Sequence, residues 1–397
     1  MASHDTRRAY LDYNATAPLR PEAREATLAA MECLGNPSSI HAEGRAARAI
    51  VEDARRAVAD LAGVEPRCVI FTSGGTEAAN FALCPTAGAA GGRALERLFV
   101  SAGEHLCVLQ GHRFAPDAVA VAPLGADGRI DLAALAALVA AADGRPAMLA
   151  LQGANNETGV IQPVAEAAAL VHAAGGLVVC DAVQLAGRGS VAVATLGADF
   201  LIVSAHKLGG PKGAGALVAA RPELHIGAPL LRGGGQERGA RAGTENVAAI
   251  AGFGAAARVA EAAWRQESVR SAVLRDALAA RLRERAPDAV IFGEAAPRLP
   301  NTLCFSVPGV AAATLVIALD LAGVAVSSGS ACSSGKVTRS HVLDAMGVAP
   351  DLAAGAIRLS LGWASDEADV ARFGAAFGET MASLRRWRDR GGVSLDI

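Results

Sequence analysis

The sequence predicts an α/β protein built around a mainly parallel β-sheet with helices on both faces. Five short segments are apolar at almost every position, and helical segments separate them. Strands of this kind are typical of parallel sheets, because both of their faces are buried. The chain of 397 residues is also long enough for two domains and a large core. The predicted strands occupy residues 69–71, 98–100, 147–151, 177–180 and 200–203.

Helices are predicted before and after these strands. Pro21 lies in the first turn of a helix over residues 21–34, which stops at Gly35-Asn36. A second helix, over about 41–62, has apolar residues along one face and ends at Gly63. A change in composition around 255–285 indicates one or two long helices, rich in arginine and glutamate, that lead into a smaller C-terminal domain.

Composition favours a small-molecule partner. The net charge is −2 and no block of like charge occurs, which argues against nucleic acid or an anionic membrane as the main partner. The N-terminus lacks the apolar region of a signal peptide, and the apolar run at 132–142 is shorter than the ~20 residues that span a bilayer. Seven cysteines without a C-x-x-C pair favour reduced thiols in the cytoplasm over disulfides or a metal site. We therefore expect a soluble, cytoplasmic protein.

Polar residues follow all five predicted strands. Ligands of parallel α/β sheets bind outside the carboxyl ends of the strands, so these residues are expected to meet at one edge. Each residue alone fits an ordinary turn, a helix cap or a satisfied histidine, but together they indicate a site. A dinucleotide fold is disfavoured, since no G-x-G-x-x-G follows the first strand. The polar segments are 72–77, 101–105, 155–156, 181 and 204–207.

Lysine is rare in this chain. Only Lys207, Lys212 and Lys336 occur, whereas the other 34 of the 37 basic residues are arginine. Arginine remains protonated in proteins, but a lysine can lose its proton and condense with a carbonyl group. Lys207 follows a predicted strand and is therefore the candidate for amine chemistry. Lys336 lies in a Ser/Gly-rich loop where function and an ordinary surface position are equally favoured, and Lys212 receives no role.

Three features near the strand ends fit the phosphate, the ring nitrogen and the aldehyde of pyridoxal phosphate. The Ser73-Gly74-Gly75-Thr76 turn opens a helix, whose N–H groups and dipole favour a phosphate. A carboxylate at Asp181 would keep a ring nitrogen protonated, and the amine of Lys207 would hold an aldehyde. The protonated ring of pyridoxal phosphate serves as an electron sink for carbanions.

The chain resembles the cysteine desulfurases, in the class V aminotransferase-like branch of fold type I pyridoxal-phosphate enzymes, nearly from end to end. The resemblance implies a large domain over 15–260 with a seven-stranded-type sheet between helices. It implies a smaller α+β domain from 1–14 plus 261–397, with the catalytic cysteine loop at about 325–340. The motifs that carry it are residues 10–18, 35–41, 71–80, 155–159, 181–184, 204–207, 233–237, 241–246, 327–332 and 357–362.

The resemblance implies roles for individual residues. Lys207 would bind the aldehyde and shuttle the Cα proton, Asp181 would pair with the pyridine nitrogen, and His105 would stack on the ring and assist acid–base steps. Arg358, with Asn14, would hold the substrate carboxylate, a task that suits the arginine fork. The remaining cofactor contacts would come from Asn156 and Gln184 at the ring substituents, and from Gly75, Thr76, Ser204 and His206 at the phosphate. Thr244 would reach the phosphate of the other subunit, which implies a homodimer.

Cys332 is the predicted nucleophile. It lies in the small, polar stretch 327–335, where a thiol can ionise and attack. The resemblance implies that Cys332 takes sulfur from L-cysteine as a persulfide, releases L-alanine, and passes the sulfur to acceptor or scaffold proteins. Four other cysteines have apolar neighbours and are predicted to be core thiols, namely Cys68, Cys107, Cys180 and Cys304.

Alternative functions remain open at this stage. A selenocysteine lyase or an aminotransferase of the same branch shares most of these motifs, although the cysteine loop argues against the aminotransferase. If the protein were a non-enzymatic sulfur carrier, Lys207, Asp181 and the Gly-Gly-Thr turn would have no function. The sequence contains no motif that identifies the sulfur acceptor, so iron–sulfur scaffolds, nitrogenase cluster assembly and tRNA thiolation relays are all compatible with it.

Overall fold

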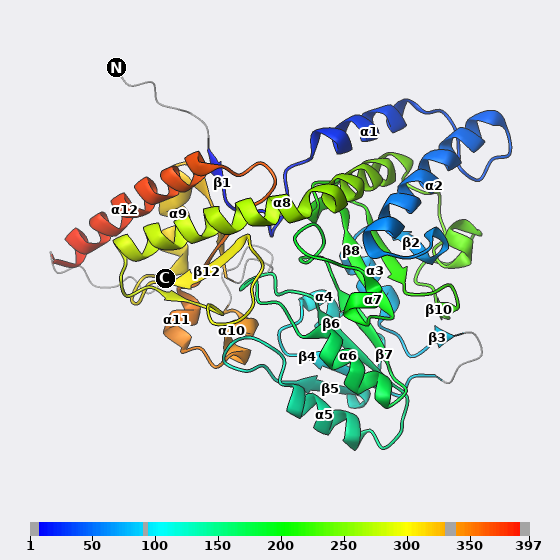
Figure 1. The fold of residues 1–397 in the computed structure, drawn as a ribbon, viewed down its shortest axis with the longest axis horizontal. Helices are drawn as coiled ribbons and strands as arrows, with labels where there is room; N and C mark the ends of the chain where they lie inside the picture. The colour runs from blue at the N-terminus through cyan, green and yellow to red at the C-terminus, as the bar shows by residue number, and fades with distance from the viewer. Residues whose placement is uncertain (1–7, 90–93, 330–338, 390–397) are drawn as a thin grey trace.

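The computed structural model describes residues 8–89, 94–329 and 339–389, and its largest element is a seven-stranded sheet (Figure 1). The strand order is β2-β9-β8-β7-β6-β4-β5. Strands β5, β4, β6, β7 and β8 run parallel, whereas β9 is antiparallel to both of its neighbours. The strands are β2 (Val69–Thr72), β4 (Arg97–Ser101), β5 (Val119–Ala122), β6 (Ala147–Gln152), β7 (Leu177–Asp181), β8 (Phe200–Ser204) and β9 (Gly215–Ala219).

The prediction of a mainly parallel α/β sheet is confirmed. Each of the five predicted runs is a strand, extended by one or two residues. Two strands of the large sheet, β5 and β9, were not identified from the sequence. Strand β5 is an edge strand whose first three residues are only partly buried or exposed, so it lacks the continuous apolar pattern of a buried strand.

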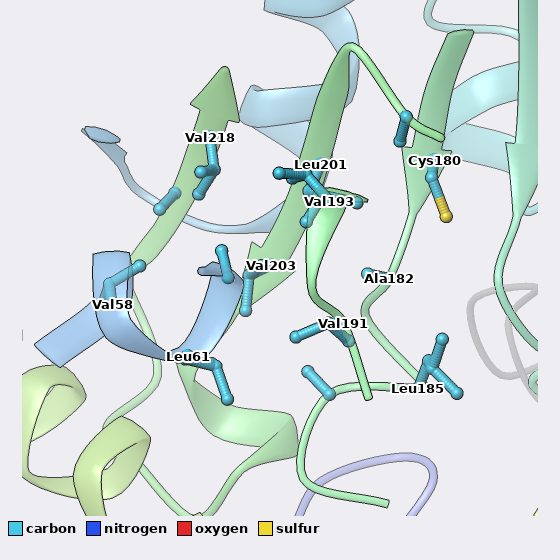
Figure 2. Packing of buried hydrophobic residues seen from close by; sticks show 14 of the residues in the cluster. Val58, Leu61, Cys180, Ala182, Leu185, Val191, Val193, Leu201, Val203 and Val218 are labelled. Atoms are coloured by element: carbon cyan, nitrogen blue, oxygen red, sulfur yellow. The ribbon is translucent and has the colours of Figure 1, made fainter. Parts of the chain in front are cut away.

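Helices cover both faces of the sheet, and side chains alternate between two cores. Along β8, Leu201 and Val203 point to one core, whereas Phe200 and Ile202 point to the other, as the two-residue period of a strand requires. Figure 2 shows the first core, where Val58 of α2 lies among the side chains of the sheet. The covering helices are α1 (Pro21–Glu32), α2 (Ala42–Ala62), α3 (Gly75–Ala82), α4 (Leu106–Leu109), α5 (Leu132–Ala141), α6 (Val164–Ala173) and α7 (Val193–Leu196).

The two N-terminal helices begin and end close to their predicted limits. Helix α1 starts with Pro21, and α2 is capped by the His41 side chain, which accepts a hydrogen bond from the Gly44 N–H. Gly63 ends α2 in the left-handed conformation, with φ of 68°, which a residue without a Cβ adopts readily.

Helix α8 (Val247–Arg285) is one continuous helix of 39 residues. Its first half packs against α1 and α2, and its second half against α12 (Glu367–Asp389), so it runs across the molecule (Figure 1). Leu274, Leu278 and Leu282 belong to a separate core beneath α12. By length and composition, α8 alone among the described helices could cross a membrane, but half of its most apolar stretch is buried inside this fold.

A smaller region contains a four-stranded sheet in the order β11-β12-β15-β14. The N-terminal strand β1 (Ala9–Tyr10) pairs with β13, and Ala9 and Leu11 join the core of this region. The domain limits of 15–260 and 1–14 plus 261–397 stay a prediction. The elements here are β11 (Val290–Ile291), β12 (Thr302–Ser306), α9 (Ala312–Leu321), β13 (Val324–Ala325), β14 (Ser327–Ser328), α10 (His341–Ala345), α11 (Pro350–Ala354) and β15 (Ile357–Ser360).

The remaining described elements are short. Strands β3 and β10 form an antiparallel pair beside the large sheet. Their limits, with those of the 3-10 helices, are β3 (Ala87–Ala89), β10 (Leu224–Ile226), η1 (Pro66–Cys68), η2 (Pro116–Ala118), η3 (Ala205–Lys207) and η4 (Gln236–Gly239).

Candidate active site

One cavity of about 310 Å³ collects the residues that follow the strands of the large sheet. Side chains from the ends of β6, β7 and β8 and from the starts of α3 and α4 line it, together with Asn14 and Arg358 from the smaller region. The structure therefore brings together most of the predicted site residues, although it does not by itself test their roles. The predicted residues in the lining are Asn14, Gly75, Thr76, His105, Asn156, Asp181, Gln184, Ser204, His206, Lys207 and Arg358.

Lys207 lies at the end of β8, in the 3-10 helix η3. Its Nζ donates to the carbonyl oxygens of Asn14, at 2.5 Å, and Ala15, at 2.9 Å. Ala205, in the same turn, is fully buried, so the backbone that carries the lysine is anchored. The amine is consequently held at the wall of the cavity, where a carbonyl compound could reach it.

Asp181 is the last residue of β7. Burial raises the pKa of Asp181, while a hydrogen bond from the Val183 N–H, at 2.9 Å, and the charges of His105 and Lys207 oppose that rise. A buried carboxylate is stabilised by a cationic partner. The site therefore favours a positively charged group, such as a protonated ring nitrogen, next to Asp181.

His105 forms the N-cap of α4, and its ring faces the cavity. Its Nδ1 accepts a hydrogen bond from the Cys107 N–H at 3.2 Å, so a neutral ring carries its proton on Nε2. Burial lowers the pKa of His105, against the opposing charge of Asp181. A neutral, partly buried imidazole is suited to stack on a ring and to exchange a proton through Nε2.

The prediction that Cys107 is a core thiol is wrong. The side chain is only partly buried, lines the cavity, and lies with its Sγ 3.0 Å from His105 Nδ1. The apolar neighbours Leu106 and Val108 suggested a core position, but the turn of α4 places Cys107 on the cavity side. Cys68, Cys180 and Cys304 are buried, as predicted.

The start of α3 has the features of an anion site. Gly74 precedes the helix without a side chain to cap it, so the first N–H groups are available and the helix dipole favours a negative charge. A Cβ at Gly75 would lie 3.1 Å from Val183 Cγ2, so the close approach of this backbone suits glycine. Ser204 lies beside Gly75, and Thr76 and His206 line the cavity as well.

His206 is neutral at physiological pH. Burial, followed by the charges of Lys207 and Lys212, lowers the pKa of His206 to about 4. Its Nδ1 lies 3.2 Å from Thr16 Oγ1. Lys212 itself is exposed and does not line the cavity described above.

Arg358 on β15 enters the cavity from the smaller region and is only 2% exposed. Its Nη1 donates to the Asn156 carbonyl at 3.0 Å, and its Nη2 donates to Asp12 Oδ1 at 2.8 Å. Among the described residues, its buried Nε has no hydrogen-bond partner. The guanidinium is thus held in place while its Nε–H donor is not used by the described residues, which fits the binding of a carboxylate.

Gln184 and Asn14 connect the two regions at the floor of the cavity. Gln184 Nε2 donates to the Asn14 carbonyl at 3.0 Å, and its Oε1 accepts from Arg188 Nη1 at 2.9 Å. The Asn14 amide donates to Thr302 Oγ1 at 2.9 Å. Both residues are almost fully buried, so their polar atoms are fixed.

These features fit pyridoxal phosphate. The open start of α3 suits the phosphate, Asp181 suits the ring nitrogen, and the amine of Lys207 suits the aldehyde. The uncapped start of α3 is the feature of this structure that a phosphate would explain.

One described site residue lies away from the cavity, and a second predicted residue is outside the described part of the chain. Thr244 is exposed, in the segment before α8. Cys332 lies outside the described residues, between Gly329 and Arg339, as does Lys336. Their roles stay predictions.

Sequence reasoning assigned no role to three acidic residues near the site. Asp12 pairs with Arg358, as described above. Glu104 is fully buried, its Oε1 accepts from the Gln152 N–H at 2.6 Å, and burial and the charge of Asp181 raise its pKa well above the ordinary value. Glu157 is buried as well, and burial raises its pKa to about 7. Glu104 and Glu157 stand in the 101–105 and 155–159 motifs, but only the fold reveals their burial.

Comparison with known proteins agrees with this geometry. The family Aminotransferase class-V matches residues 9–373. A cysteine desulfurase of Cereibacter sphaeroides is 42% identical over 374 residues, which cover 92% of this chain and 93% of the relative. The cysteine desulfurase IscS of Dictyoglomus turgidum is 39% identical and covers 92% of each chain.

Solved structures with the same fold include desulfurase-like proteins. A NifS-like protein from Rickettsia africae superposes with a TM-score of 0.85 at 33% identity, covering 94% of this chain and 99% of that one. The cysteine desulfurase CsdA from Escherichia coli superposes with a TM-score of 0.78 at 26% identity, covering 96% of each chain.

Proposed function

The chain belongs to the class V aminotransferase family, as a pyridoxal-phosphate-dependent cysteine desulfurase. From this premise we propose which of its residues bind the cofactor, bind the substrate and transfer the sulfur. The observation that carries the proposal is the convergence of Lys207, Asp181, the open start of α3 and Arg358 on one cavity. The reaction is L-cysteine plus the thiol of Cys332 giving L-alanine plus a persulfide on Cys332.

Residues at the strand ends of the large sheet and in the adjoining α3 and η3 would hold the cofactor. Lys207 would bind the aldehyde, Asp181 would keep the ring nitrogen protonated, and Thr76, Ser204 and His206 with the Gly75 N–H would hold the phosphate. When bound, pyridoxal phosphate supplies an electron sink that stabilises negative charge at the substrate Cα. His105 would stack on the ring, and Asn156 and Gln184 would contact its polar substituents.

Lys207 and Arg358 act on the substrate. Arg358, helped by Asn14, pairs with the carboxylate of L-cysteine, which places the Cα beside the Lys207 amine. The Nζ of Lys207 would take the Cα proton of the substrate and later return a proton to the product. Positioning of this kind and proton transfer by a neighbouring side chain are both established contributions to rate.

Cys332 performs the sulfur step. Its thiolate attacks the substrate sulfur, so an S–S bond forms as the substrate C–S bond breaks, and the electron pair of that bond becomes the new C–H bond of alanine. Substrate sulfur is oxidised from thiol to the persulfide level, and the carbon is reduced, so no external oxidant is required. A protein acceptor then takes the outer sulfur.

Dimerisation and the acceptor are further parts of the proposal. The exposed position of Thr244 supports a role at the phosphate of a second subunit, since this residue does not reach the cavity of its own chain. We propose a homodimer whose sulfur is delivered to an iron–sulfur scaffold or to a thiolation relay. Cytoplasmic localisation stays a prediction.

The experiment follows sulfur and alanine together. Purified protein loaded with pyridoxal phosphate should show a visible absorption band that borohydride bleaches, and it should convert L-cysteine to L-alanine. Alkylation and mass spectrometry should place the persulfide on Cys332. The Cys332→Ser variant should keep the band and lose the persulfide, and a variant that still forms alanine at the full rate would remove the role of Cys332.

A further inference from the structure

The structure fixes both ends of the chain around Cys332. Before the 330–338 segment, β14 pairs with β15, and Ser327 lies opposite Arg358. The Gly329 N–H then donates to the Ala356 carbonyl at 2.7 Å. After the segment, the described chain resumes at Arg339 and reaches Ser340, the residue before α10. The first attachment is thus made by strand pairing beside the proposed carboxylate site.

The second attachment depends on the Ser340 side chain. Its Oγ donates to Glu157 Oε2 at 2.5 Å and accepts from the Leu343 N–H at 3.1 Å, which caps α10. Ser340 is 2% exposed and Glu157 is 4% exposed. A hydrogen bond to a carboxylate is stronger in a dry interior than in water, so this contact holds the start of α10 to the turn that follows β6.

Two further contacts keep α10 in place. His341 Nε2 lies 2.9 Å from the Glu104 carbonyl oxygen, one residue before His105. Val342 and Leu343 pack in a small core with Cys304 of β12. The residues that follow the Cys332 segment are therefore joined to two of the turns that carry cavity residues, those at 104–105 and 156–157.

The turn that holds Ser340 also holds Arg358. The Asn156 carbonyl accepts from Arg358 Nη1 at 3.0 Å, one residue before Glu157. The charge of Arg358 is close enough to lower the pKa of Glu157, against the larger effect of burial. A single short turn therefore connects the proposed carboxylate site to the chain downstream of Cys332.

We propose that Glu157 and Ser340 form a positioning pair, which fixes the chain after the Cys332 segment relative to Arg358. The inference rests on the proposed function, in which Cys332 receives the sulfur. Neither side chain lines the cavity. The pair therefore controls the rate of sulfur transfer to Cys332, whereas the binding of L-cysteine does not depend on it.

The test measures these two steps separately in the cofactor-loaded enzyme. Persulfide on Cys332 is followed in a single turnover by rapid quenching and alkylation, and cysteine binding is followed by the visible spectrum. At about pH 8, where Glu157 is mostly ionised, Ser340→Ala should slow persulfide formation about tenfold, the effect of one lost hydrogen bond to a charged group. The cysteine concentration for half of the spectral change should stay within about twofold, because the positioning acts after binding. Ser340→Thr keeps the hydroxyl and should recover most of the rate.

Variants of Glu157 distinguish the loss of the Glu157–Ser340 hydrogen bond from the loss of the α10 cap, because Glu157 does not cap the helix. Glu157→Ala should slow persulfide formation as Ser340→Ala does, and the double variant should be no slower than either, because the same contact is lost. Glu157→Gln keeps an acceptor oxygen for Ser340 and should stay within about threefold of the wild-type rate. These variants decide the question even if Ser340→Ala does not fold.

Asp131→Ala is the matched control. Asp131 caps α5 by accepting from the Ala133 and Ala134 N–H groups, and α5 packs on β5 and α6. Equal slowing by Asp131→Ala, or wild-type persulfide rates in Ser340→Ala and Glu157→Ala, would overturn the inference. Full sulfur transfer in Cys332→Ala would instead overturn the proposed function, so the two failures are distinguishable.

Discussion

The proposed cofactor site around Asp181 and Lys207 (the cofactor end) and the region of Arg358, Glu157 and Ser340 (the sulfur end) are built in different ways. At the cofactor end, Asp181 ends β7 and Lys207 follows the adjacent parallel strand β8, and the continuous backbone pairing of these strands sets their positions. At the sulfur end, Ser340 is held by a side-chain hydrogen bond to Glu157, and Arg358 by Asp12 and the Asn156 carbonyl. Loss of one side chain at the cofactor end should therefore abolish a chemical step while leaving the backbone in place. Loss of one side chain at the sulfur end should instead change the positions of neighbouring residues.

The largest effect is expected from Lys207→Ala, at the cofactor end. The variant should lose the covalent chromophore and at least about a thousandfold in alanine formation, since both aldehyde binding and proton transfer are lost. Far-ultraviolet circular dichroism should remain unchanged, because the strand that places the residue does not depend on its side chain. Lys212→Ala, at an exposed position, is the control and should keep the wild-type rate.

Asp181→Asn should have the next largest effect. The change removes the carboxylate that favours a protonated ring, so alanine formation should fall about 10²- to 10³-fold, the range for a lost electrostatic contact in an active site. The spectrum of the bound cofactor should change as well. A variant with wild-type activity and spectrum would show that Asp181 does not face the ring nitrogen.

Glu157 should make the stability of the sulfur end depend on pH. Burial raises its pKa from 4.5 to about 7, so between these values the folded protein retains a proton that the unfolded chain has released. The free energy of unfolding therefore falls as the pH rises from about 4.5 to 7, by at most about 3 kcal/mol for this group. Glu157→Gln should lack this part of the decline in urea titrations at fixed protein and cofactor concentration. An identical pH dependence in both proteins would contradict the assignment.

Arg358→Lys should give the smallest of these effects. Lysine keeps the charge but not the fork that donates to Asp12 and the Asn156 carbonyl at once. The KM for L-cysteine should rise about tenfold, the effect of one lost charge-assisted hydrogen bond, with a smaller change in kcat. A fall in kcat at unchanged KM would place Arg358 in the sulfur step instead of in carboxylate binding.

The same contrast explains what the sequence could predict. The apolar runs before Asp181 and Lys207 identify buried strands, and the parallel arrangement then dictates that the residues after them meet. Strand β9 was missed, although all five of its residues are buried. The prediction that Cys107 is a core thiol was wrong, because its apolar neighbours in the sequence do not determine which side of a short helix faces the core.

The residues of the sulfur end could not be predicted in this way. Glu157 and Ser340 are 183 positions apart, and their contact exists only because α10 packs on β12. A glutamate in a motif rich in polar residues resembles an exposed side chain until the fold shows its burial. Asp12 is a similar case, since its partner Arg358 is 346 positions away. Long-range pairs of single side chains leave no periodic signal in the chain.

The central claim is that the amine of Lys207 carries the cofactor. The most direct test reduces the cofactor-loaded protein with borohydride, digests it, and locates the pyridoxyl group by peptide mass spectrometry. The chain offers only two other lysines, Lys212 and Lys336, so the result is unambiguous. We predict a stoichiometric adduct on Lys207 alone. An adduct on Lys212 or Lys336, or an unmodified Lys207 in a protein that still forms alanine from L-cysteine, would contradict the account.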